Sequence, residues 1–169
     1  MLAYLFVVLA LLVRFVSVPI SIAPVGGALL FFGARGPRRH WWIPVLLLAG
    51  GDLVLTKFIY GYPYTLDHLI TVAWYAAVLL MGRLLLENAR PWRVVVAALA
   101  ASVGFFAISN FSVWLMGNMY PYTLNGLAVC YAAAVPFFRK QVVSDVLFTA
   151  LMFSVPVVIA LLKPQTAKA

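Results

Sequence analysis

The side chains best suited to chemistry are a few polar groups set inside long apolar runs. Asp52 follows Gly50 and Gly51 within one run, and Asn110 lies in a later one. A carboxylate in such surroundings is costly, so we expect it to face the protein interior. There it can pair with a cation, bind a polar group of a ligand, or take up a proton. A structural hydrogen bond to Asn110 or Ser109 is an equal alternative.

A repeated aromatic motif follows each of these polar positions. Tyr62-Pro63-Tyr64-Thr65-Leu66 recurs letter for letter as Tyr120-Pro121-Tyr122-Thr123-Leu124, and the same offset aligns Asp52 with Asn110. Proline interrupts a helix, threonine is a good N-cap, and tyrosine favours the membrane interface, so the motif is explained as a helix start within an aromatic belt. The functional alternative is a pair of aromatic loops that cover an outward-facing pocket.

If such a pocket exists, polar groups and nearby aromatic side chains should line it. The residues that we expect to contact a ligand are Asp52, Asn110, Trp74, Tyr75, Trp114, Tyr64 and Tyr122.

Motifs for catalysis or metal binding are missing from the sequence. It contains no GxSxG, HExxH or Walker lysine loop, and its single cysteine, Cys130, lies in an apolar run. The two histidines, His40 and His68, are expected on opposite faces of the membrane, which argues against a metal site. We therefore predict that the protein is not an enzyme and has no metal or cofactor; any coupling to ATP must come from a partner.

The composition indicates which elements position these residues. The 169 residues are 66% hydrophobic and 9% charged, against roughly 45–50% and about 25% in soluble domains. This surplus of apolar surface excludes a soluble globular protein and must face lipid. We predict one all-α integral membrane domain, residues 1–169, folded as a polytopic helix bundle. The first apolar run lacks a basic leader region and carries Arg14, so we interpret it as a retained helix.

Seven apolar segments are visible along the chain. Five of them can cross a bilayer, one is marginal, and Ala23–Phe32 is either a short tucked helix or a span extended by its flanks. We therefore predict six to seven transmembrane helices, with two like-oriented repeat hairpins at 41–86 and 92–138. The segments are Met1–Val16, Ala23–Phe32, Trp41–Tyr60, Leu66–Leu86, Trp92–Leu115, Thr123–Phe138 and Val142–Leu162.

The net charge of +8 is carried by short basic clusters between apolar segments. Nucleic-acid binding is not indicated, because these residues form neither one face nor a tail. Lys and Arg are retained on the cytoplasmic side, so we predict that the Arg-rich loops are cytoplasmic and the two Tyr-Pro-Tyr-Thr loops face outward. We interpret Glu87 and Asp145 as local neutralisation of the clusters. The clusters are Arg35, Arg38 and Arg39; Arg83, Arg90 and Arg93; and Arg139 and Lys140.

An ordered set of motifs resembles a family of small bacterial multi-pass membrane proteins of unknown function. The resemblance covers roughly residues 22–155 and implies no activity. It rests on the run Ala23-Pro24-Val25-Gly26-Gly27 through Gly33, on Gly51-Asp52-Leu53, on Ser109-Asn110-Phe111 with Trp114, on Tyr120-Pro121-Tyr122-Thr123, and on Pro136-Phe137-Phe138.

More distantly, the layout is similar to that of the substrate-binding S components of energy-coupling-factor transporters. This similarity implies a six-helix fold in the bacterial cytoplasmic (inner) membrane, with a vitamin or metal ion held under outward loops at 17–22, 61–65 and 117–122. It also implies a transmembrane coupling protein and ATPases as partners. The first helix departs from the S components, because it shows no small-x-x-x-small face for docking between Ala3 and Ala10.

Two functions follow from these observations. The first is a substrate-binding component of a small-molecule transporter, of the vitamin or cofactor type, with an outward-facing pocket. The alternative is a non-catalytic accessory or structural subunit of a larger membrane complex. The intramembrane pair Asp52 and Asn110 favours the first, because a scaffold does not require such groups.

Overall fold

The computed structural model describes residues 1–16, 23–63, 65, 67–87 and 90–162, and every regular element in them is helical. The prediction of an all-α fold is confirmed for this part of the chain. The elements are α1 (Leu2–Val16), α2 (Val25–Arg35), a 3₁₀ turn η1 (Arg38–His40), α3 (Trp42–Val54) continued by a π-helical turn η2 (Leu55–Ile59), α4 (Asp67–Leu86), α5 (Pro91–Met116) and α6 (Leu124–Leu162).

Helix length and composition give the structure the character of a membrane protein. Four helices among the described residues are long and apolar enough to cross a bilayer, whereas α1 and α2 are shorter apolar helices. The predicted six to seven spans are not confirmed: the described residues form six α-helices, and four helical segments can cross a membrane by length and composition. The four are Arg38–Ile59, His68–Leu86, Pro91–Met116 and Leu124–Leu162.

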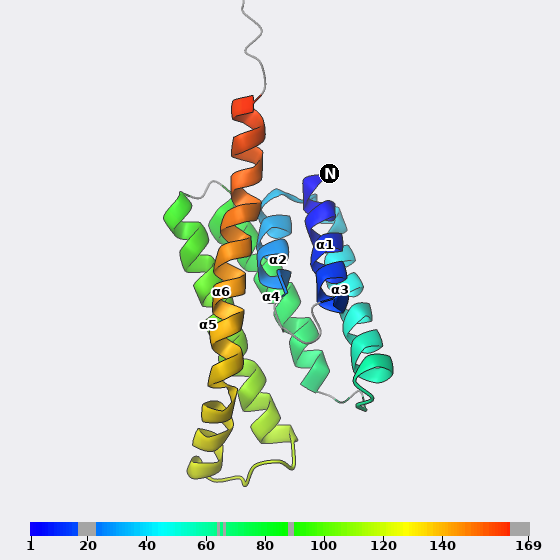
Figure 1. Cartoon of the computed structure of the whole chain (residues 1–169), viewed down its shortest axis with the longest axis vertical. Helices are drawn as coiled ribbons and strands as arrows, with labels where there is room; N and C mark the ends of the chain where they lie inside the picture. The colour runs from blue at the N-terminus through cyan, green and yellow to red at the C-terminus, as the bar shows by residue number, and fades with distance from the viewer. Residues whose placement is uncertain (17–22, 64, 66, 88–89, 163–169) are drawn as a thin grey trace, which may run out of the picture.

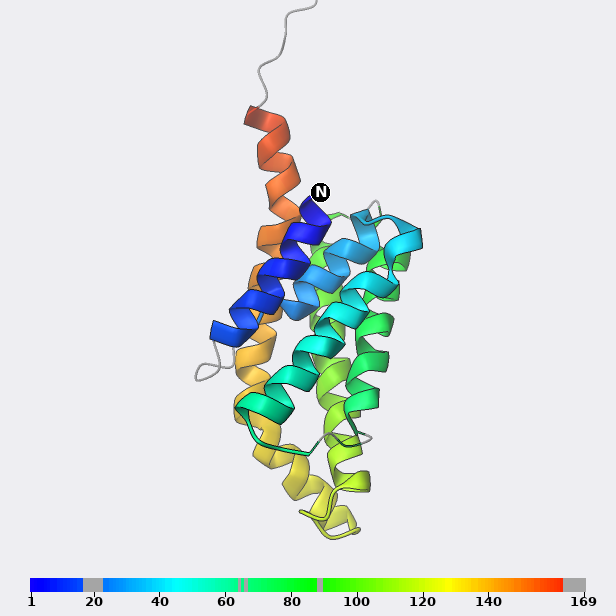
Figure 2. The same ribbon diagram turned by 90° about the vertical axis from the view of Figure 1, so that its right-hand side faces the viewer.

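The bundle has three layers (Figure 1), and Figure 2 looks onto the side formed by α1 and α3. α1 and α3 form one side, α5 and α6 form the other, and α2 and α4 lie between them. α2 is buried along Gly27–Ala34 and contacts α4, α6, α1 and α5. It begins after Pro24 and ends where the Gly36 N–H donates to the Phe32 carbonyl at 2.7 Å. Of the two alternatives for Ala23–Phe32, the structure shows the short tucked helix.

The last two apolar segments are one helix, so the prediction of a break between Thr123–Phe138 and Val142–Leu162 was wrong. α6 has 39 residues, about 58 Å at helical rise, and contains Pro136 and Pro156 without being interrupted. The predicted loop rested on two adjacent charges, Arg139 and Lys140. Neither is a helix breaker, and no glycine or proline lies between them and Val142. These two residues lie within α6 rather than in a loop beside the other basic clusters.

The two segments predicted as repeat hairpins do not pack alike. α5 and α6 lie closely side by side, whereas α4 packs mainly against α2 and α5 and only slightly against α3. The inserted helix α2 therefore takes the place beside α4 that α3 would hold in a matching hairpin. The connections after η2 and after α5 nevertheless lie at the same end of the bundle, the lower end in Figure 1.

Candidate functional site

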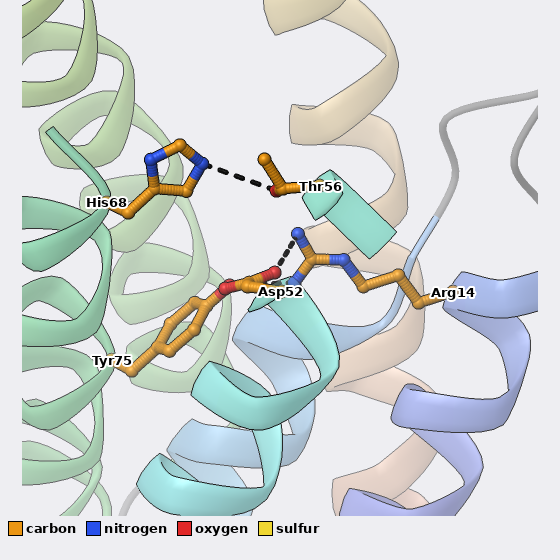
Figure 3. A network of polar contacts seen from close by, with 5 residues as sticks. All are labelled: Arg14, Asp52, Thr56, His68 and Tyr75. Carbon is orange, nitrogen blue, oxygen red and sulfur yellow. Dashed lines mark hydrogen bonds and ion pairs between the residues drawn. The ribbon is translucent and has the colours of Figure 1, made fainter. Parts of the chain in front are cut away.

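Asp52 is the centre of a closed polar network between α1, α3 and α4 (Figure 3). The Arg14 guanidinium forms an ion pair with Oδ1 of Asp52. The Tyr75 hydroxyl donates to Oδ2 at 2.6 Å, and Nη1 of Arg14 donates to the Tyr75 oxygen at 2.7 Å. Asp52 is only 4% exposed. Of the roles predicted for Asp52, the structure shows pairing with a cation, and its partner is Arg14 rather than Asn110 or Ser109.

The helix is widened immediately beyond Asp52. The π-helical turn η2 starts at Leu55, and Thr56 Oγ1 lies 3.3 Å from Nε2 of His68 on α4. A single π turn inside an α-helix is frequent at functional sites. This second contact between α3 and α4 lies near the Asp52–Tyr75 bond and fixes the same two helices (Figure 3).

A cavity of about 290 Å³ lies beside this network, bounded by α1, α2, α4, α5 and α6. Trp74 and Tyr75, two of the seven predicted ligand contacts, line it, and Arg14 lies at its wall. Its apolar walls combine aliphatic and aromatic side chains. The lining residues are Arg14, Ala23, Val25, Gly26, Leu29, Tyr60, Trp74, Tyr75, Val78, Ala101, Phe105, Phe137, Gln141, Ser144 and Asp145.

Asp145 is a second buried carboxylate on this cavity, so its interpretation as a surface partner of basic clusters was wrong. It is 4% exposed, and Ser102 Oγ of α5 donates to its Oδ2 at 2.7 Å. The Gln141 side chain and the backbone N–H of Gly26 are further neutral donor groups beside this carboxylate. Gly26 lies in the first turn of α2, whose free N–H groups have no partner within their own helix. Glu87 does behave as predicted, because it pairs with Arg83 at 2.7 Å.

A sequence signal for Asp145 existed and was missed. Gln141, Ser144, Asp145 and Thr149 recur at helical spacing, which places them on one face of a helix. The last three are buried in the structure, and Ser144 Oγ donates to the Ala23 carbonyl at 3.2 Å. A polar stripe inside an apolar helix indicates a face that is turned away from lipid.

The other predicted contacts lie elsewhere. Asn110 donates from Nδ2 to the Phe106 carbonyl of its own helix at 2.7 Å, and neither it nor Asp52 is among the described residues that line the cavity. The structure does not bring Asp52 and Asn110 into one site. Tyr64 and the loop at 17–22 lie outside the described residues.

Trp114 and Tyr122 hold the second aromatic loop together. Trp114 Nε1 donates to the Pro121 carbonyl at 3.0 Å, and the Trp114 and Tyr122 ring centres are 6.0 Å apart. Thr123 Oγ1 accepts from the Gly126 N–H at 3.1 Å. This is the predicted N-cap of α6, and it supports the structural explanation of the motif at this loop.

The arrangement contains the elements of a binding site. Polar groups from three helices converge on a cavity whose remaining walls are apolar and aromatic, a combination typical of small-molecule sites. The Arg14–Asp52 pair is neutral as a unit, whereas Asp145 is held only by neutral donors among the described residues.

Comparison with known proteins identifies a family and no activity. No protein of curated function and no solved structure matches this chain. A family model described as "Family of unknown function (DUF6580)" matches residues 1–168, so the predicted resemblance to an uncharacterised family is confirmed. The chain therefore belongs to DUF6580, a family of unknown function.

Proposed function

We propose that this membrane protein binds a small molecule in the cavity beside Arg14 and Asp145 and acts as the substrate-binding component of a small-molecule transporter. The observation that carries the proposal is the convergence of Arg14, Tyr75, Gln141 and Asp145 on one cavity inside an apolar helix bundle. Buried ionisable groups in a membrane bundle are costly and usually mark a site of function. A protein that only packs against partners does not require a cavity lined by buried ionisable groups.

The cavity suits a small, partly aromatic compound. Its volume of about 290 Å³ lies near the lower end of the range for small-molecule sites, roughly 300–1,000 Å³. The rings of Trp74, Phe105 and Phe137 offer flat apolar walls, and polar groups lie at the borders. A vitamin-like or cofactor-like heterocycle has this combination of a flat body and a few polar substituents.

Within this proposal the protein lies in the bacterial cytoplasmic membrane with its Arg-rich end inside. Support comes from the bundle itself: the ends of α2 and α4, the start of α5 and the turn η1 lie together at the upper end in Figure 1, and they carry two of the three basic clusters. The connections with the repeated aromatic motif lie at the opposite end, which we assign to the outside. This shared orientation agrees with two related segments, 41–86 and 92–138.

The roles of the seven predicted contacts differ in this proposal. Trp74 and Tyr75 contact the ligand, and Asp52 positions Arg14 and Tyr75 from behind. Trp114 and Tyr122, together with Asn110, belong to the outer entrance, whereas Tyr64 stays a predicted ligand contact outside the described residues. Energy comes from a transmembrane coupling protein with ATPases, since the sequence holds no nucleotide-binding motif of its own.

Filling the cavity tests the proposal. We expect Ala101→Phe on α5 and Val25→Phe on α2 to abolish retention of the small molecule, because both side chains line the cavity. Val103→Phe is the matched control: it is on the same helix as Ala101 but exposed. The measurement is mass spectrometry of compounds that survive purification in mild detergent, combined with ligand-induced thermal stabilisation.

A variant is interpreted only if it keeps a cooperative thermal transition. Because the two cavity-filling substitutions lie on different helices, the test still works if one of the variants does not fold. Retention at the wild-type level in both fillers contradicts the proposal. So does a wild-type protein that carries no compound and is stabilised by none in a metabolite library.

A second function is favoured by one observation, the far end of α6. The C-terminal end of α6 extends past the other helices at the Arg-rich end (Figures 1 and 2), and Val157, Leu161 and Leu162 near this end are exposed. An accessory subunit can use this end to contact another membrane protein. Truncation after Val155 then releases a fixed partner that co-purifies with the full chain, whereas isolation of the full chain as a monodisperse single species contradicts this role.

A further inference from the structure

The two buried carboxylates of the bundle differ in how their charge is balanced. Asp52 is paired with the guanidinium of Arg14. Among the described residues, Asp145 has no ion pair. The Ser102 hydroxyl donates to it at 2.7 Å, and the Gln141 side chain and the Gly26 N–H are neutral donor groups beside it. Arg139 and Lys140, on the same helix as Asp145, are exposed rather than turned toward it.

The cavity that Arg14 and Asp145 line therefore has an excess of negative charge. The positive charge of Arg14 is already matched by Asp52, so among the described residues the N-terminus of α2 is what offsets the charge of Asp145. A helix N-terminus is equivalent to roughly half of an elementary charge. In surroundings of low dielectric constant an incompletely balanced carboxylate attracts a cation strongly.

The structural role of Asp145 at the start of α2 does not use all of its capacity. Two carboxylate oxygens offer about four acceptor positions. The Ser102 hydroxyl occupies one of them at 2.7 Å, and Gln141 and the Gly26 N–H can occupy at most two more. The Asp145 side chain also lines the cavity. A carboxylate that only accepts hydrogen bonds from the first turn of α2 would not need to reach the cavity. One acceptor position thus remains for a donor that enters the cavity.

The walls around Asp145 are suited to the same kind of ligand. Phe137 and Phe105 lie on the same cavity, with Trp74 and Tyr75 on α4. Aromatic faces attract cations through the negative potential above the ring. Several rings and one carboxylate around a small cavity provide a binding site for a positively charged nitrogen on an apolar body.

We propose that the ligand of this cavity is an organic cation, a protonated amine or charged heterocycle with a flat apolar body, whose charged nitrogen binds the carboxylate of Asp145. This inference rests on the proposed binding function and adds the charge class of the ligand to it. Anionic compounds are excluded by Asp145, and neutral ones lose the charge-assisted hydrogen bond.

Compounds that differ only in charge test the inference. We would measure binding to purified full-length protein in detergent by thermal shift and by equilibrium titration, using a panel of amine, alcohol and carboxylate triplets on flat rings; tryptamine, tryptophol and indole-3-acetate form one triplet. We expect amines to bind at least about tenfold more tightly than their alcohols, and the carboxylates not to bind.

Asp145→Asn is the decisive variant, because the amide keeps a hydrogen-bond acceptor for the start of α2 but removes the charge. It should abolish the preference for amines while neutral compounds still bind. Glu87→Gln makes the same chemical change at an exposed carboxylate and should leave the preference intact. Amine preference that survives in Asp145→Asn overturns the assignment to this side chain.

The failure of this inference and the failure of the proposed function give different results. If carboxylates or alcohols bind as tightly as amines, and Ala101→Phe prevents their binding, the cavity is a ligand site but the charge class is wrong. If no compound of the panel binds to the wild type, the inference is overturned. The proposed binding function also fails if, in addition, the purified wild type carries no molecule that is missing from the cavity-filling variants.

Discussion

Replacing Arg14 with methionine should lower the free energy of unfolding by about 3–5 kcal/mol, which is the usual cost of removing one partner from a buried ion pair. The remaining Asp52 carboxylate is 4% exposed and keeps only the Tyr75 hydroxyl as a described partner. The measurement is unfolding of the purified protein by titration of sodium dodecyl sulfate into mixed micelles, followed by circular dichroism.

The double variant Arg14→Met with Asp52→Leu separates the cost of a lone charge from the value of the pair. Apolar replacement of both partners removes the unpaired carboxylate, so we expect it to recover most of the lost stability. Glu87→Gln is the control for a charge pair outside the bundle core. It breaks the Arg83–Glu87 contact of 2.7 Å, in which Glu87 is exposed, and should change stability by about 0.5 kcal/mol or less. An Arg14→Met variant as stable as Glu87→Gln would show that Asp52 gains little from its cation.

The Arg14–Asp52 pair shows what could and could not be predicted from the sequence. An aspartate within an apolar run has to face the interior, and the structure places Asp52 there. Its partner could not be identified, because the pair joins two helices that are separated along the chain by all of α2. Local spacing predicts neighbours on one helix and does not predict which helices meet.

The repeated motif predicted loop chemistry better than it predicted packing. Thr123 caps α6 as expected, because capping depends on residues a few positions away. Asn110 aligns with Asp52 in sequence but bonds to its own helix, since α2 packs beside α4 and the two segments meet different neighbours. Equal sequence offsets therefore do not give equal surroundings once an additional helix enters the bundle.

The errors along α6 have one origin, the treatment of charge as a sign of the membrane surface. On this basis the charges of Arg139 and Lys140 predict a loop, and Asp145 is interpreted as their neutralising partner. Helix formation is local and continues through these residues, because no glycine or proline lies between Pro136 and Pro156. The spacing of Gln141, Asp145 and Thr149 was the more informative pattern, since it identifies a face rather than an end.

After the Arg14–Asp52 pair, the contact between α2 and α4 is the second place where we expect a substitution to lower the free energy of unfolding strongly. A Cβ on Gly33 would lie 1.9 Å from the Leu79 carbonyl oxygen, and one on Gly82 would lie 2.2 Å from the Leu30 carbonyl oxygen. The neighbouring atoms are backbone, so neither can rotate away, and the helices have to separate. Small residues allow this close approach of helix backbones in membrane proteins.

Gly33→Ala and Gly82→Ala should therefore each lower the free energy of unfolding by about 1–3 kcal/mol, in the range of overpacked cores. Combined, they should cost less than the sum of the single effects, because the first substitution already separates the helices and makes room for the second. Gly50→Ala on α3 is the matched control: a Cβ there meets nothing within 4 Å, and alanine favours a helix by up to about 1 kcal/mol over glycine. The same detergent titration measures all four variants. Equal changes in the free energy of unfolding for Gly33→Ala and Gly50→Ala would mean that α2 and α4 do not approach as closely as the structure shows. Close backbone packing on α4 would then not be what holds α2 in its buried position beside the cavity.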